Sequence, residues 1–320
     1  PTFVPDPQLG NTDLEIKPIF FGGNVFGWTL NEEESFRILD GFLDRGFNAI
    51  DTANNYSYWV KGNVGTESER IIGNWLKSRG VRDKIVLATK VGGRNMIQDK
   101  PNTTKVHILK EVEESLIRLQ TDYIDLYQTH YDDVNTPVEE TLSAYNQLIK
   151  EGKVRFIGAS NFSSERLTES LDKSELYNLP QYKTLQPEYN LYDRQHFEEF
   201  LQPVAEKYNL AVIPYYSLAS GFLSGKYKTE EDLQQSLRGN GIKKYLNERG
   251  FKILDALQTI STRYNISYSA VALAWLMDQK TVVAPIASAT KEQHLDAFVE
   301  AVNVQLSHDD VKLLTEASEY

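Results

Sequence analysis

Four residues with acid–base side chains could work together on one proton. Asp51, Lys90 and His130 each end a short apolar run typical of a buried strand, and Tyr56 follows Asp51 by five residues. Tyrosine has an ordinary pKa of about 10, which is too high for easy proton exchange near neutrality. A neighbouring ammonium group stabilises the phenolate and lowers that pKa, and Lys90 is the candidate for this role.

The combined chemistry of these residues favours carbonyl reduction. Asp51 would hold Lys90 in place and charged, while His130 would donate a hydrogen bond to a substrate oxygen. Such a set can give a proton to a carbonyl oxygen as a hydride arrives at the carbonyl carbon. Taken singly, each residue also fits an ordinary structural role: a turn cap, a rim aromatic, a solvated lysine or a satisfied polar histidine.

Eight apolar runs, separated by amphipathic stretches, are the predicted strands that would position these residues. The runs are continuous rather than alternating, which is typical of parallel strands covered on both faces. Eight strand and helix units predict an α/β fold, a (β/α)8 TIM barrel, with an open doubly wound sheet as the alternative. In a barrel, the C-terminal ends of all strands open on one face, where the four residues would meet. The predicted strands are 19–23, 47–51, 84–90, 123–130, 154–160, 184–189, 210–216 and 282–287.

Predicted helix starts separate the strands. Each has a cap residue followed three positions later by a glutamate, the pattern of a capping box or of an acidic first turn. The three clearest are Asn31 with Glu34, Thr66 with Glu69, and Thr136 with Pro137 and Glu139.

Residues 1–320 contain no recognisable linker and are interpreted as a single barrel domain. One region breaks the alternation: a polar stretch at 221–248, after the seventh strand, is rich in Gly, Lys, Glu and Asn. Long loops in compact domains are usually lids or binding loops, so this segment is predicted to border a site. A disordered insertion is the alternative.

Composition excludes several classes of function. The net charge is −11 and the pI about 5.1, which argues against nucleic acid or an anionic membrane as the main partner. The chain has no cysteine, so disulfides, thiolate catalysis and cysteine-ligated metals are impossible. No metal site is expected, because the five histidines lack metal-ligand spacing. No long apolar run or secretory signal is visible, and a cytoplasmic protein is the expectation. The oligomeric state is left open.

Several segments, taken in order, resemble the aldo-keto reductases. They are LGNTDLEIKPIFFGG near the start, then FNAIDTANNY, KIVLATK, YIDLYQTH, FIGASNF and PYYSLASGFLSGKY. The resemblance runs from about residue 9 to 300 and implies a (β/α)8 barrel with an N-terminal hairpin segment. It also implies reduction of small aldehydes and ketones with NADPH, less often NADH, and without a metal.

The resemblance gives each motif residue a role. Tyr56 matches the proton donor, which Lys90 and Asp51 tune. His130 matches the residue that orients the substrate carbonyl.

The resemblance also predicts a cofactor site. Ser160 and Asn161 would hydrogen-bond the nicotinamide carboxamide with Gln186 beside them, and Tyr216 would stack on the nicotinamide ring. The other predicted contacts are Ser217, Leu218, Gly221 and Lys226 along the pyrophosphate, and Ser288, Thr290 and Lys291 near the ribose 2′-phosphate.

One position departs from the family pattern. Many members carry arginine where His294 aligns, and histidine is a poorer fixed partner for a phosphate than an arginine fork. Lys291 supports NADPH over NADH, and NADH stays possible.

Trp28 and Trp59 are the predicted substrate contacts, because ligand sites are usually lined by apolar and aromatic side chains. Ordinary loop packing is the alternative for both.

A regulatory protein on the same scaffold, resembling the cofactor-binding potassium-channel β subunits, is the alternative function. The complete set of four residues favours the enzyme.

Overall fold

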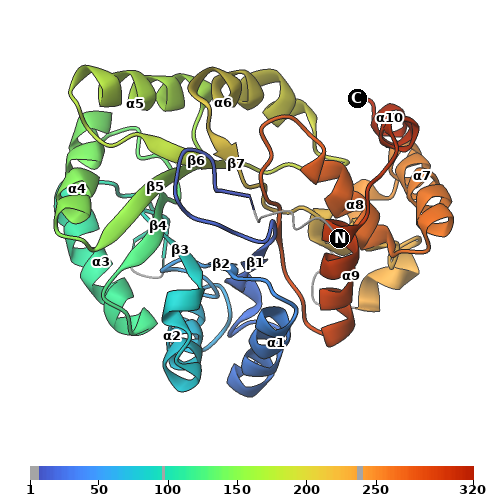
Figure 1. The fold of residues 1–320 in the computed structure, drawn as a ribbon, viewed down its shortest axis with the longest axis horizontal. Coiled ribbons are helices and arrows are strands. Elements are labelled where there is room, and N and C mark those ends of the chain that lie inside the picture. Colours follow the sequence, from blue (N-terminus) through green and yellow to red (C-terminus); the bar gives the residue numbers. More distant parts are fainter. Residues whose placement is uncertain (1–6, 96–97, 236–240) are drawn as a thin grey trace.

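Eight parallel strands form the centre of the molecule. The computed structural model describes residues 7–95, 98–235 and 241–320. Within these residues, the strands pair in the order β7-β6-β5-β4-β3-β2-β1-β8, and helices surround them (Figure 1). The strands are β1 Phe20–Gly22, β2 Ala49–Asp51, β3 Val86–Val91, β4 Ile124–Thr129, β5 Val154–Ser160, β6 Tyr182–Gln186, β7 Ala211–Val212 and β8 Ile286–Ala287.

Backbone hydrogen bonds join the two ends of this strand order. The N–H of Val283 donates to the carbonyl of Val212 at 2.9 Å, and the N–H of Ile286 donates to that of Pro214 at 2.9 Å. A parallel bridge also pairs Val212 with Val282. The predicted (β/α)8 barrel is therefore confirmed, and the open doubly wound sheet is wrong.

The helices follow the strands along the chain and lie outside them. Short 3₁₀ or π segments occur at 23–25, 82–84, 197–201, 219–224, 230–235 and 243–245. The α-helices are α1 Glu32–Asp44, α2 Glu67–Arg79, α3 Lys105–Leu119, α4 Val138–Lys150, α5 Ser164–Leu176, α6 Gln202–Tyr208, α7 Glu248–Tyr264, α8 Tyr268–Met277, α9 Glu292–Asn303 and α10 His308–Ala317.

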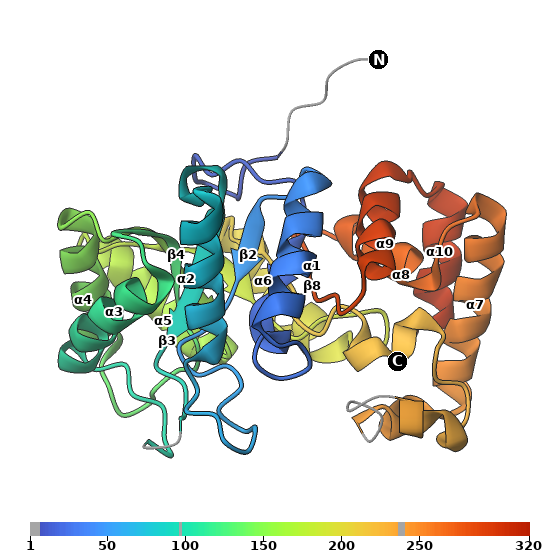
Figure 2. The ribbon, with the colours of Figure 1, turned by 90° about the horizontal axis from the view of Figure 1, so that it is seen from below.

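The N-terminal segment forms the predicted hairpin and covers one end of the barrel. Gln8 and Glu15 form an antiparallel bridge, and the N–H of Leu9 donates to the carbonyl of Leu14 at 2.8 Å. Leu9 and Leu14 are buried in the same cluster as Phe20 of β1. The hairpin lies at one end of the molecule, and the described residues 221–235 and 241–248 lie toward the other (Figure 2). The hairpin thereby leaves the opposite barrel end for the site.

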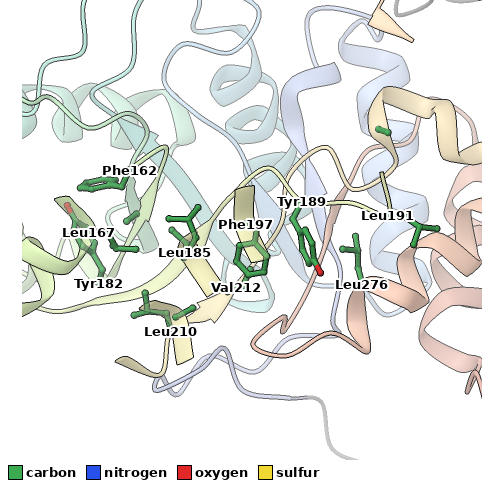
Figure 3. Packing of buried hydrophobic residues seen from close by; sticks show 14 of the residues in the cluster. Phe162, Leu167, Tyr182, Leu185, Tyr189, Leu191, Phe197, Leu210, Val212 and Leu276 are labelled. Carbon is green, nitrogen blue, oxygen red and sulfur yellow. The ribbon is translucent and has the colours of Figure 1, made fainter. Parts of the chain in front are cut away.

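Most of the core lies between the strands and the helices. Tyr182 and Leu185 of β6 pack in one buried cluster with Leu167 of α5 and Leu276 of α8 (Figure 3). Burying a large apolar side chain stabilises the fold by about 1.5–3 kcal/mol, so this layer holds the strands in register. Among the described residues, no helix has the length and apolar character needed to cross a membrane.

The capping box predicted at Asn31 is confirmed, whereas the box at Thr66 is wrong, although Thr66 is the N-cap residue of α2. The N–H of Glu34 donates to Asn31 Oδ1 at 2.8 Å, and the N–H of Asn31 donates to Glu34 Oε1 at 3.1 Å. The Thr66 hydroxyl caps no N–H group and accepts instead from Arg70 Nε at 2.8 Å. The Glu67 carboxylate accepts the backbone N–H groups of residues 64–66, including that of Thr66. Glu69 turns inward instead and pairs with Arg118 at 2.7 Å.

The helix start predicted at Thr136 is displaced by one residue. Helix α4 begins at Val138, with Pro137 as its cap rather than its first residue. The Thr136 hydroxyl donates to Asp133 Oδ2 at 2.6 Å, so it is engaged in the preceding loop.

Strands β7 and β8 are shorter than their predicted runs of 210–216 and 282–287. Tyr216 takes a left-handed conformation with φ of 53°, which turns the chain away from the sheet. The described part of 221–248 contains short 3₁₀ helices, and residues 236–240 lie outside the description. Its role as a lid or binding loop stays a prediction.

The two caps can be compared directly by mutation. Asn31→Ala should lower the free energy of unfolding by about 1 kcal/mol, because it removes both bonds of the capping box. Thr66→Ala is the matched control and should cost less than half as much. Urea denaturation of both variants measures the difference, and equal costs would contradict this account of the caps.

Candidate active site

The structure brings Asp51, Tyr56, Lys90 and His130 together at the C-terminal ends of β2, β3 and β4. Asp51 is the last residue of β2, and His130 comes directly after β4. Tyr56 lies in the turn after β2. The barrel order β4-β3-β2 places these strands next to one another, so residues distant in the sequence become neighbours.

Lys90 is the centre of the group. Its Nζ donates to Asp51 Oδ2 at 2.6 Å, to Tyr56 OH at 2.7 Å and to the carbonyl of Thr52 at 3.0 Å. An ammonium group has three donors, and all three are used here. Lys90 is 0% exposed and Asp51 1% exposed, so water screens this ion pair little. Burial lowers the pKa of Lys90, and the Asp51 carboxylate opposes that shift.

The pKa of Tyr56 differs in direction from the sequence expectation. Lys90 contacts the phenol as predicted, yet burial raises the pKa of Tyr56 well above its ordinary value, and the negative charge of Asp51 raises it further. Desolvation dominates because ionising a buried phenol creates a negative charge that water cannot reach to solvate. Tyr56 is therefore protonated near neutral pH.

His130 faces Tyr56 as a neutral ring. The two ring centroids lie 5.9 Å apart with an interplanar angle of 82°. Burial lowers the pKa of His130 well below its ordinary value, and the positive charge of Lys90 adds to the shift. A neutral imidazole carries one N–H donor and one acceptor nitrogen, so His130 can hydrogen-bond without bringing a charge.

Two buried glutamines complete the surroundings of Asp51. Gln128 Nε2 donates to Asp51 Oδ1 at 2.8 Å, and Gln186 Nε2 approaches the same oxygen at 3.3 Å. Gln186 was singled out from the sequence as a cofactor contact, whereas Gln128 was missed. The available signal was a polar amide inside the apolar run 123–130, two residues before His130.

The predicted nicotinamide contacts Ser160 and Asn161 lie at the end of β5. Ser160 Oγ donates to the carbonyl of Gln186 at 2.8 Å, and Asn161 Nδ2 donates to that of His130 at 2.8 Å. Tyr215 OH donates to Asn161 Oδ1 at 2.9 Å. These bonds connect the ends of β4, β5 and β6 into one rim beside the four residues.

Tyr216 presents its ring to solvent beside this rim. The side chain is 54% exposed, and Asn190 Nδ2 donates to the carbonyl of Tyr216 at 3.0 Å. Ser217 is buried, and its hydroxyl donates to the carbonyl of Pro214 at 3.1 Å. The backbone of Tyr216 is held by a hydrogen bond while its aromatic ring stays exposed, so a flat ligand can stack on the ring.

The next predicted contacts follow in a sharply turned segment. Gly221 has a φ of 101°, a conformation that favours glycine, and its N–H donates to the carbonyl of Leu218 at 3.0 Å. Lys226 is exposed at the end of this turn.

The predicted 2′-phosphate residues gather at the start of α9. His294 Nδ1 accepts the backbone N–H groups of Thr290 at 3.1 Å and Lys291 at 3.3 Å. Burial lowers the pKa of His294, and the positive charges of Lys291 and Lys226 lower it further. Lysines from the start of α9 and from the segment after β7 thus both act electrostatically on one histidine. Ser288 is turned aside, since its hydroxyl donates to the carbonyl of Gly22 at 2.7 Å.

Trp28 and Trp59 contact each other in the loops after β1 and β2. Their ring centroids lie 5.7 Å apart in an edge-to-face arrangement, and Trp59 is 48% exposed. Tyr58 also packs edge-to-face on Trp59 at 5.7 Å. In the part of the chain that the structure describes, no cluster of three or more His, Asp or Glu side chains could hold a metal ion.

Comparison with known proteins identifies the class. Residues 18–319 match the model of the Aldo/keto reductase family. The chain is 35% identical to aldo-keto reductase YhdN of Bacillus subtilis, over 97% of this chain and 91% of that protein. It is 28% identical to protein tas of Escherichia coli (94% of each chain) and 28% identical to the putative aryl-alcohol dehydrogenase AAD14 of Saccharomyces cerevisiae (94% of this chain, 83% of that protein).

The barrel and these matches define an oxidoreductase. The chain belongs to the aldo-keto reductase family, whose members act on small carbonyl compounds and generally use NAD(P)H.

The lowered pKa of His130 predicts a loss of stability in acid. Below a pH of about 6.5 the unfolded chain takes up a proton on this residue and the folded chain does not, so stability falls as the pH falls. Between about pH 7.5 and 5.5, the His130→Asn variant should lose about 1 kcal/mol less free energy of unfolding than the wild type does, because it lacks this titrating group. Urea denaturation at both pH values measures this.

Exposed His308 offers the matched control, His308→Asn. If the His130 and His308 variants lose the same stability over this pH interval, the neutral state assigned to His130 is wrong.

Proposed function

We propose that the protein reduces a small aldehyde or ketone with NADPH, and that Tyr56 donates the proton to the carbonyl oxygen. The observation that carries this proposal is the position of Lys90 Nζ, which lies 2.6 Å from Asp51 Oδ2 and 2.7 Å from Tyr56 OH. The whole barrel, 1–320, would work as one catalytic unit.

Lys90 directs the proton of Tyr56. Because the ammonium group donates to the phenol oxygen, the phenol's own hydrogen is free to point elsewhere, toward a substrate oxygen. The raised pKa keeps that hydrogen in place until a stronger base forms. An alkoxide oxygen is such a base, and Lys90 stabilises the phenolate that remains.

His130 would orient the substrate. A neutral imidazole can donate one hydrogen bond to a carbonyl oxygen without protonating it. Tyr56 and His130 would then hold the same oxygen from two nearly perpendicular rings. Donors fixed before the reaction stabilise the charge that develops on that oxygen.

The chemistry of the rim residues fits a nicotinamide nucleotide. Hydroxyl and amide groups of Ser160, Asn161 and Gln186 suit a carboxamide, and the exposed ring of Tyr216 suits the flat nicotinamide. When bound, this cofactor supplies the hydride that reaches the carbonyl carbon. The turn containing Ser217, Leu218, Gly221 and Lys226 would bind the pyrophosphate.

The positive charge of two lysines acting on His294 supports NADPH rather than NADH. Lys226 and Lys291 both act electrostatically on His294, so a phosphate placed there would meet the positive charge of both lysines. Thr290 would add a hydroxyl, whereas the Ser288 hydroxyl, bonded to the carbonyl of Gly22, would lie beside the phosphate without donating to it.

The substrate pocket would take an apolar or aromatic group. Trp28 and Trp59 offer aromatic edges and faces in the loops after β1 and β2, and such surfaces favour flat substrates. The name of the yeast relative, an aryl-alcohol dehydrogenase, agrees with this choice. Aromatic aldehydes are therefore the first substrates to test.

Tyr56→Phe tests the proton donor. The variant should bind NADPH like the wild type and lose turnover by on the order of a thousandfold, since only the hydroxyl is removed. NADPH oxidation with a panel of aromatic and aliphatic aldehydes, followed by absorbance, measures this. Near wild-type turnover would refute the assignment, and tight NADPH binding by the wild type without any turnover would favour a regulatory protein.

Lys291→Ala tests the preference for NADPH. The variant should weaken NADPH about tenfold and leave NADH nearly unchanged, because the lost partner contacts only the extra phosphate. Lys280→Ala, at an exposed lysine before β8, is the control. Fluorescence titration with both nucleotides measures the affinities, and an equal loss for both would contradict the proposed phosphate contact.

A further inference from the structure

We propose that Gln128 is a positioning residue, whose amide holds the Asp51 carboxylate in the orientation from which it pairs with Lys90. The inference rests on the proposed function, because it concerns the group that would deliver the proton. Gln128 has no part in the roles that the sequence motifs predict.

The hydrogen bonds around Asp51 divide its two oxygens between different partners. Oδ2 accepts from Lys90 at 2.6 Å, whereas Oδ1 accepts from Gln128 Nε2 at 2.8 Å. Gln128 Oε1 in turn accepts from Gln186 Nε2 at 2.7 Å, and Gln186 Nε2 reaches Asp51 Oδ1 at 3.3 Å. The two glutamines and the carboxylate form a closed ring of contacts, so rotation of the carboxylate would break bonds on both of its sides.

The barrel makes room for this amide. Gln128 of β4 is fully buried and lies in register with Lys90 of β3 on one side and Gly158 of β5 on the other. A Cβ atom at Gly158 would lie 3.2 Å from Gln128 Cγ and 2.1 Å from Thr184 Oγ1. The absence of a side chain on β5 therefore leaves space for Gln128 inside the barrel, one strand away from Lys90.

An amide at this position has an electrostatic consequence that an apolar side chain lacks. Burying an amide costs free energy that methionine or leucine would not cost, so filling space does not account for glutamine here. A hydrogen bond to a charged acceptor is stronger than one between neutral groups. Without Gln128, the Asp51 carboxylate could turn and would support the buried ammonium of Lys90 less well.

The charged and titratable groups around Lys90 define what a measurement would detect. They are Asp51 of β2, Glu69 of α2, Tyr56 in the turn after β2 and His130 after β4. Of these, Asp51 is the group that Gln128 contacts. Burial lowers the pKa of Lys90 and Asp51 opposes this, so misplacing Asp51 should lower the pKa of Lys90 further.

The first test uses the cofactor-free protein and needs no turnover. Lysine labelled with ¹³C at Cε reports the titration of Lys90 by NMR, with its signal assigned from Lys90→Met. Gln128→Met should move the Lys90 midpoint to lower pH by about one unit. Gln147→Met is the matched control and should leave the midpoint unchanged, because Gln147 is an exposed glutamine of α4 that bonds Glu151 at the end of that helix.

The second test measures turnover against pH. Gln128→Met should lower kcat by about tenfold or more while the affinity for NADPH changes little. Gln128→Glu should retain most of the activity at low pH, because a protonated carboxyl group can donate to Asp51 and accept from Gln186 as the amide does. Its activity should fall as the pH rises, when two carboxylates would face each other.

The outcomes separate the alternatives. A folded Gln128→Met protein whose Lys90 titration and kcat match the wild type overturns the inference, because Gln128 would then contribute only to packing. If Gln128→Met does not fold, the pH profile of Gln128→Glu decides: recovery at low pH supports positioning, and a profile parallel to the wild type overturns it. If wild-type turnover proves independent of Tyr56, the proposed function fails, and the Lys90 titration still decides the role of Gln128.

Discussion

The burial of one ion pair, Asp51 with Lys90, is the constraint on which the arrangement of the site depends. Two opposite charges out of water are tolerated only when the geometry is good and their remaining hydrogen-bonding capacity is satisfied. Here the hydrogen bonds of the pair are completed by four further residues. Thr52 and Tyr56 accept from Lys90, and Gln128 and Gln186 donate to Asp51. The position of each of these side chains or carbonyls is therefore constrained by its hydrogen bond to the ion pair.

The barrel supplies this environment from separate parts of the chain. Adjacent strands deliver the carboxylate, the ammonium and the imidazole to one end, while the N-terminal hairpin covers the other. The loops after the strands then add the aromatic rings of Tyr56, Trp28 and Trp59. The framework is set by burial between strands and helices, so the loops can vary in sequence while the ionic centre stays in place.

The sequence predicted the features that have a local pattern, namely the strands and one capping box. It missed the features that depend on residues distant in the sequence. Eight apolar runs and the box at Asn31 were visible because their signals are local. The box at Thr66 failed because Glu67, one residue later, accepts the Thr66 N–H that Glu69 would have accepted. The pKa of Tyr56 was predicted in the wrong direction, because the extent of burial cannot be read from a motif. Gln128 was overlooked because its partner lies two strands away.

The central claim is that this buried pair serves proton transfer rather than stability. Replacing both members by apolar residues of similar size, Asp51→Leu with Lys90→Met, tests it directly, since such replacements are often neutral or stabilising. We expect the double variant to have a free energy of unfolding in urea within about 2 kcal/mol of the wild type and to have lost aldehyde reduction. A stable double variant that still reduces aldehydes at the wild-type rate would contradict it.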